Sequence, residues 1–128
     1  MKEWMKGTKH PSDAVDFQTK KSLYEVKSCK LLLEGDDGSG TLTHKLGRFY
    51  IVGRNHDEIY ALAKKENKRP KYLFALRLGK HLVWKTFHWG SVEMLRKDYF
   101  GESYYDEDFD RDQPFLLRVL DVFKEMGE

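Results

Sequence analysis

The chain has 128 residues and a mass of 15.2 kDa, which suits one domain and is short for two. Hydrophobic residues make up 40% and aromatic residues 14%, enough for a core, so disorder along the whole chain is excluded. No apolar run approaches the roughly 20 residues that cross a bilayer, and we expect a soluble, cytoplasmic (intracellular) protein without a membrane partner. The single cysteine, Cys29, excludes an internal disulfide and a cysteine-rich zinc site.

Charge is unevenly distributed along the chain. Residues 102–112 hold six acidic side chains and one arginine. Since the net charge of the whole chain is +2, the residues outside this segment carry a net charge of +7. The basic residues gather in two groups, one around Lys20 and Lys21 and one formed by Lys64, Lys65, Lys68 and Arg69. This distribution favours a polyanionic partner such as DNA, although ordinary solvated surfaces produce the same pattern.

The first half of the chain predicts a hairpin, a loop, a strand and a helix. Residues 13–17 and 23–33 read as two strands joined by a polar turn, and residues 34–45 have the glycine and aspartate content of a mobile loop. Residues 48–52 form a compact apolar strand. Asn55, followed by Glu58, has the spacing of a capping pair that opens a helix to about residue 67.

The second half predicts two strands and two helices. Residues 72–78 are apolar on nearly both faces, which indicates a central strand, and 82–89 form a second hairpin with it. A short helix over 91–99 precedes an acidic loop at 102–112, and the apolar spacing of 114–126 predicts a closing amphipathic helix. We therefore expect one α/β domain over residues 1–128, with a central mixed β-sheet flanked by helices.

The first hairpin carries two carboxylates and a lysine that can meet. Glu25 and Lys27 are two residues apart on a strand and therefore project to the same face, with the Val26 carbonyl between them. If Asp13 faces Glu25 across the hairpin, two carboxylates and one carbonyl form an oxygen-rich site suited to Mg²⁺, for which Mn²⁺ could substitute. Such a site can activate water against a phosphate.

These residues resemble the signature of the PD-(D/E)XK nuclease superfamily, an Asp at the start of one strand and Glu-x-Lys on the next. The matching segments are residues 11–15 (PSDAV) and 23–27 (LYEVK), and their spacing is similar to that in archaeal Holliday-junction resolvases and several restriction enzymes. The resemblance implies a restriction-endonuclease-like core and a metal-dependent endonuclease acting on DNA. It also implies that Asp13, Glu25 and the Val26 carbonyl bind the metal while Lys27 assists hydrolysis.

Several alternatives stay open at this point. Asp16 lies on the opposite side of the predicted strand from Asp13, and either residue could join Glu25; we take Asp13. The family core usually begins with a helix that often carries another Glu; Glu3, the closing helix or a second subunit could fill that place. We expect a homodimer, with the apolar stripe of residues 115–126 as its seam and DNA phosphates bound at Lys20, Lys21, Lys64, Lys65, Lys68 and Arg69. A non-catalytic nucleic-acid-binding module on the same fold is the main alternative function.

Overall fold

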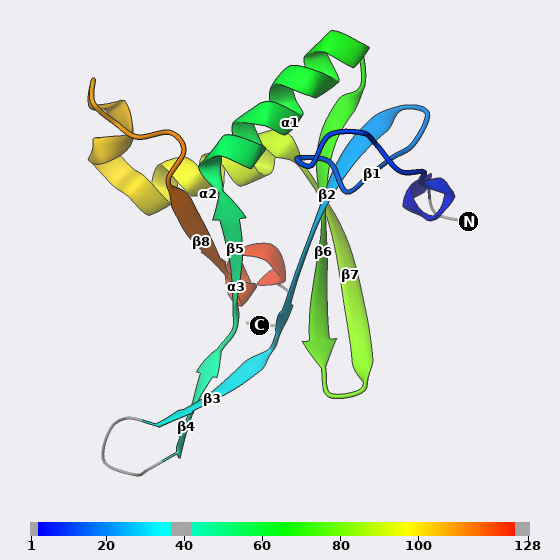
Figure 1. The fold of residues 1–128 in the computed structure, drawn as a ribbon. Coiled ribbons are helices and arrows are strands. Elements are labelled where there is room, and N and C mark those ends of the chain that lie inside the picture. The colour runs from blue at the N-terminus through cyan, green and yellow to red at the C-terminus, as the bar shows by residue number, and fades with distance from the viewer. Residues whose placement is uncertain (1–2, 37–41, 125–128) are drawn as a thin grey trace.

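The structure is a computed structural model that describes residues 3–36 and 42–124 (Figure 1). Helices are interspersed among the strands, with a mixed central sheet, which confirms the predicted α/β class. The elements are η1 (Glu3–Lys6), β1 (Phe17–Gln18), β2 (Ser22–Lys30), β3 (Leu32–Asp36), β4 (Leu42–Leu46), β5 (Arg48–Val52), α1 (Gly53–Glu66), β6 (Arg69–Leu78), β7 (His81–His88), α2 (Trp89–Phe100), η2 (Gly101–Tyr105), β8 (Pro114–Arg118) and α3 (Val119–Val122).

A four-stranded mixed sheet forms the centre of the fold. Its strand order is β1-β2-β6-β7, in which β2 and β6 are parallel and the other two pairings are antiparallel. The connection from β2 to β6 includes α1, as parallel neighbours require a crossover. β6 is central as predicted, because residues 72–76 are all buried. Two smaller antiparallel ladders, β3-β4 and β5-β8, extend beside this sheet.

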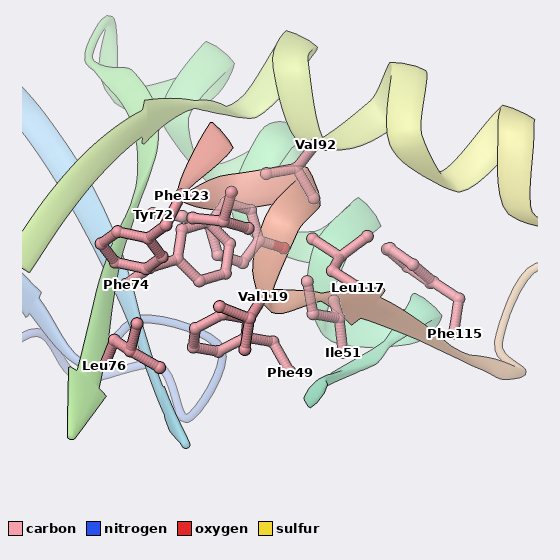
Figure 2. Packing of buried hydrophobic residues seen from close by; sticks show 11 residues of the cluster. Phe49, Ile51, Tyr72, Phe74, Leu76, Val92, Phe115, Leu117, Val119 and Phe123 are labelled. Carbon is pink, nitrogen blue, oxygen red and sulfur yellow. The ribbon is translucent and has the colours of Figure 1, made fainter. Parts of the chain in front are cut away.

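The main core lies between the central sheet and the β5-β8 ladder (Figure 2). Phe49 of β5 meets Phe74 of β6 edge to face, with ring centroids 4.8 Å apart, and Phe115 and Leu117 of β8 are fully buried in the same cluster. A second cluster lies under α1, where Ile59 and Ala63 pack on Leu23 and Val15. β2 is therefore anchored to α1 by apolar packing at Leu23.

The prediction of a closing helix over residues 114–126 is wrong for the first half of this segment. Residues 114–118 form β8, which pairs antiparallel with β5 and aligns Phe115 with Ile51. Phe115, Leu117 and Val119 are buried while Arg118 is exposed, an alternation that fits a strand. The only described helix in this region is the single turn α3; residues 125–128 lie outside the described part. Phe115, Val119 and Phe123 of the predicted dimer seam fill the chain's own core and are not available to a second subunit, whereas Leu120 is exposed.

Other local predictions also need correction. β1 contains only Phe17 and Gln18 instead of residues 13–17, because residues 11–14 form turns and bends. The expected loop over 34–45 is largely the hairpin of β3 and β4, while residues 37–41 lie outside the description. Helix α1 begins after Val52 without a side-chain cap, so the Asn55 and Glu58 capping pair does not form its N-terminus. Within residues 3–36 and 42–124, no helix combines the length and apolar character that a membrane crossing requires.

Candidate active site

Glu25 and Lys27 lie on the same face of β2, as the sequence predicts. β2 is an inner strand of the central sheet, and Glu25 is only 7% exposed because its neighbours along and across the sheet pack around it. The Lys27 ammonium nitrogen lies 3.5 Å from Oε1 of Glu25 and stays partly exposed. A charged pair in such a buried setting is less common than one on an open surface, so the pair has a structural or functional reason to be there.

Asp16, not Asp13, lies next to Glu25. Asp16 directly precedes β1 and lies against residues 24–26 of β2, where its carboxylate acts on the Glu25 side chain and raises the pKa of Glu25. The Asp16 backbone N–H donates to the Tyr24 carbonyl at 2.8 Å, and Oδ2 of Asp16 accepts a 2.6 Å hydrogen bond from the Val26 N–H. Asp13 is an exposed turn residue. Of the two candidates, Asp16 is therefore the one that lies beside Glu25.

The Val26 carbonyl points toward the same edge of β2 as Asp16. Residues in a strand direct their N–H and C=O groups to the same side, and the Val26 N–H is bonded to Asp16. β1 ends at Phe17, so at this point the edge of β2 faces the Asp16 side chain rather than a continuing strand. The carboxylates of Asp16 and Glu25 and the carbonyl of Val26 therefore come from two consecutive positions of β2 and one residue beside them.

The environment of Glu25 favours an added cation. Burial raises the pKa of Glu25 to about 8, the nearby Asp16 carboxylate adds to this, and Lys27 opposes it. Oε2 of Glu25 is buried without a hydrogen-bond partner, which is destabilising for a polar atom. Hard oxygen donors of this kind fit Mg²⁺. In the described part of the chain, however, no three His, Cys, Asp or Glu side chains are grouped as a metal site, so the protein would supply two carboxylates and a carbonyl.

Four of the six predicted DNA-binding residues gather at one cavity. It lies where β2 and β6 begin and has a volume of about 470 Å³. Lys64 and Lys65 occupy the exposed last turn of α1 and do not line it. The lining residues are Lys20, Lys21, Ser22, Asn67, Lys68, Arg69 and Lys71.

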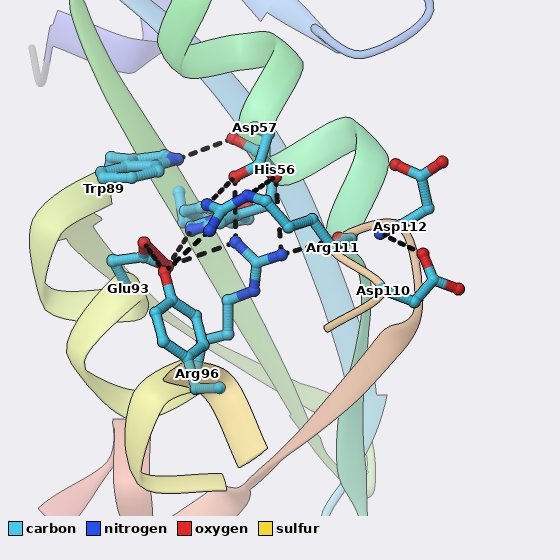
Figure 3. A network of polar contacts seen from close by, with 10 residues as sticks. His56, Asp57, Trp89, Glu93, Arg96, Asp110, Arg111 and Asp112 are labelled. Atoms are coloured by element: carbon cyan, nitrogen blue, oxygen red, sulfur yellow. Dashed lines mark hydrogen bonds and ion pairs between the residues drawn. The ribbon is translucent and has the colours of Figure 1, made fainter. Parts of the chain in front are cut away.

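A second polar cluster was not predicted from the sequence. Arg96 of α2 is fully buried, lies 2.9 Å from Oδ1 of Asp57 on α1, and donates to the Arg111 carbonyl at 2.6 Å (Figure 3). The Arg111 side chain also pairs with Asp57, at 3.1 Å. Through these contacts the acidic segment 102–112 is attached to α1 and α2, and in Figure 1 it lies far from the β1-β2 turn.

His56 belongs to this cluster and connects several elements of the fold through its side-chain contacts. Burial lowers the pKa of His56 and raises the pKa of Tyr72, and Nδ1 of His56 shares a 2.6 Å hydrogen bond with the Tyr72 hydroxyl. Nε2 of His56 lies 3.4 Å from Oε1 of Glu93, and its ring stacks on Trp89 with centroids 4.4 Å apart. The imidazole thus joins α1 to α2 and β6.

Comparison with known proteins does not place the chain in a family. Models of known protein families, curated proteins and solved structures were all searched, and none of the three gave a match.

Proposed function

We propose that the protein is a Mg²⁺-dependent endonuclease that hydrolyses DNA phosphodiester bonds at Asp16, Glu25 and Lys27. The observation that carries this proposal is the meeting of Asp16 and Glu25 at the edge of β2, with Lys27 3.5 Å from Glu25 and one oxygen of Glu25 buried without a partner. Burial and Asp16 both raise the pKa of Glu25, and a divalent cation held by the two carboxylates would offset this penalty on the charged form.

Each group has a defined task in this proposal. Asp16, Glu25 and the Val26 carbonyl hold the divalent cation, for which Mn²⁺ could substitute; when bound, Mg²⁺ activates water and neutralises charge on the phosphate. Lys27 is partly exposed at the same face and holds its ammonium group where it can contact the substrate phosphate or the attacking water. The Val26 N–H keeps the Asp16 carboxylate turned toward this position.

DNA is the proposed substrate because cations line the cavity on the strand that carries Glu25. Ser22, at the start of β2, lines that cavity together with four lysines and an arginine. Phosphate neutralisation by such side chains dominates affinity for nucleic acid. Cutting both strands of a duplex requires two sites, so a homodimer remains part of the proposal, with a seam other than β8.

The test is cleavage of supercoiled plasmid and of labelled branched DNA with Mg²⁺ or with EDTA. We expect nicking with Mg²⁺, none with EDTA, and none from Glu25→Gln, whose circular dichroism and DNA affinity should match the wild type. Undiminished nicking by Glu25→Gln would refute the assigned site.

A non-catalytic nucleic-acid-binding module is the second candidate. It is favoured by the small number of acidic ligands, since the described residues group only Asp16 and Glu25 at this position. Salt-dependent DNA binding without cleavage under any divalent cation would support this candidate over the endonuclease.

A further inference from the structure

The cavity at the start of β2 has the charge and size of a phosphate site. Its charged lining residues are all cationic, and no Asp or Glu lines it. The volume of about 470 Å³ lies in the range of ligand pockets. A neighbouring cavity of about 480 Å³ shares two of its residues, Lys20 and Lys21, and adds Lys6 and Thr19. The cations therefore surround a concave surface instead of being scattered over a convex one.

Hydrogen bonds hold the walls of this cavity in place. The Arg69 N–H donates to the Lys21 carbonyl at 2.9 Å, which joins the start of β6 to the β1-β2 turn. The Lys68 ammonium donates to Oε1 of Gln18 at 2.7 Å and to the Thr19 carbonyl at 3.0 Å, so this lysine supports the turn. Within residues 3–36 and 42–124, the side chains of Lys20, Lys21 and Arg69 are exposed and form no ion pair with an acid, which leaves their charge available to a ligand.

We propose that this cavity binds a DNA backbone phosphate within about three nucleotides of the bond that is cut. The inference rests on the proposed function, because it takes the cut to occur at Glu25. Ser22 and Glu25 are three residues apart on β2, or roughly 10 Å at about 3.3 Å per residue. Successive phosphates of one DNA strand are separated by at least their axial advance of about 3.4 Å per nucleotide, so a span of roughly 10 Å covers at most about three nucleotides.

Binding measured in EDTA tests the cavity without requiring cleavage. The variant Lys20→Ala/Lys21→Ala removes two exposed cations, and Lys80→Ala, an exposed lysine in the turn at the other end of β6, is the matched control. The double variant should flatten the slope of log K against log salt by about one to two units and weaken binding by about eightfold per lost contact at 0.1 M salt. A slope equal to that of Lys80→Ala would overturn the proposal.

Mapping of cut positions on end-labelled duplexes then tests the spacing. Wild-type protein should cut more slowly within about three nucleotides of one type of end, because no phosphate reaches the cavity there. A phosphate added to that end should restore the cleavage rate only when it lies within this distance of the cut. The variant Lys20→Ala/Lys21→Ala should cleave terminal and internal positions at equal rates. Equal wild-type rates at terminal and internal positions would overturn the spacing. A protein that binds through the cavity and never cuts would instead refute the proposed function alone.

Discussion

The carboxylate of Asp16 and the backbone N–H of Val26 are joined by a 2.6 Å hydrogen bond across ten residues of sequence. This bond places an acid at the point where β1 stops and the edge of β2 becomes open. It also turns the Val26 carbonyl toward the same point, because N–H and C=O of a strand residue share a direction. The oxygen atoms proposed to bind the cation are thus positioned by the sheet itself.

Mg²⁺ should stabilise the folded protein through this site. A ligand at 100 times its dissociation constant adds about 2.7 kcal/mol to the free energy of unfolding, which should raise the Tm by several degrees. Glu25→Gln should lose this increase, since its amide replaces the carboxylate ligand. Differential scanning fluorimetry with and without Mg²⁺ measures the effect, and Lys80→Ala is expected to keep it. An equal Mg²⁺ shift in Glu25→Gln would place the ion elsewhere.

Lys27 should matter for cleavage more than for folding. Its contact with Glu25 is partly exposed, and such pairs contribute about 0 to 1 kcal/mol to stability. Loss of a positioned proton donor or charge typically lowers catalytic rates by about 10²- to 10⁴-fold. Lys27→Met should therefore reduce the single-turnover cleavage rate by about this factor with little change in Tm. A normal rate in this variant would limit Lys27 to its ion pair.

Arg96 should be among the residues on which stability depends most. Its guanidinium is fully buried between Asp57 and Glu93, and removal of one partner from such a network leaves buried charge uncompensated. Arg96→Met should lower the free energy of unfolding by about 3 kcal/mol. Urea denaturation gives the value. Arg54→Met breaks the exposed pair with Asp112 and should have a far smaller effect; equal losses in the two variants would contradict the role of burial.

Glu93 should make the fold sensitive to acid. Burial opposes its ionisation, but interactions with His56 and Tyr104 outweigh this and lower the pKa of Glu93 to about 2, from 4.5. Because the folded-state pKa is depressed, the stabilisation is complete above pH 4.5 and is lost as the pH falls toward 2.

The variant Glu93→Gln isolates this contribution. It should be less stable than the wild type at pH 6, and the difference between the two should shrink as the pH falls below 4.5. Thermal unfolding between pH 6 and pH 3 measures this difference. A difference in stability between the two proteins that stays constant from pH 6 to pH 3 would show that the carboxylate charge does not stabilise the network.

Much of the site on β2 could be predicted because it depends on a local rule. Glu25 and Lys27 are two residues apart, so their side chains had to share a face once the segment formed a strand. The central position of β6 followed in the same way from apolar residues on both faces.

The choice between Asp13 and Asp16 could not be made by such a rule. It depends on where the chain turns before β1, and the turn at residues 11–14 is built from side-chain contacts: the Ser12 N–H donates to Nδ1 of His10, and the Ala14 N–H donates to Oγ of Ser12. These contacts involve no hydrophobic periodicity. The helix predicted over residues 114–126 was wrong for a related reason. The apolar spacing of these residues fits a helix over the whole segment and a strand over its first part, and pairing with β5 favours the strand.

Single-turnover cleavage by Asp16→Asn and Asp13→Asn tests the central claim most directly. The two variants make the same chemical change three residues apart, at the edge of β2 and in an exposed turn. With saturating enzyme and Mg²⁺, Asp16→Asn should lose cleavage while Asp13→Asn cuts at close to the wild-type rate. Loss of activity in Asp13→Asn, with Asp16→Asn still active, would contradict a nuclease site built on Asp16 and Glu25.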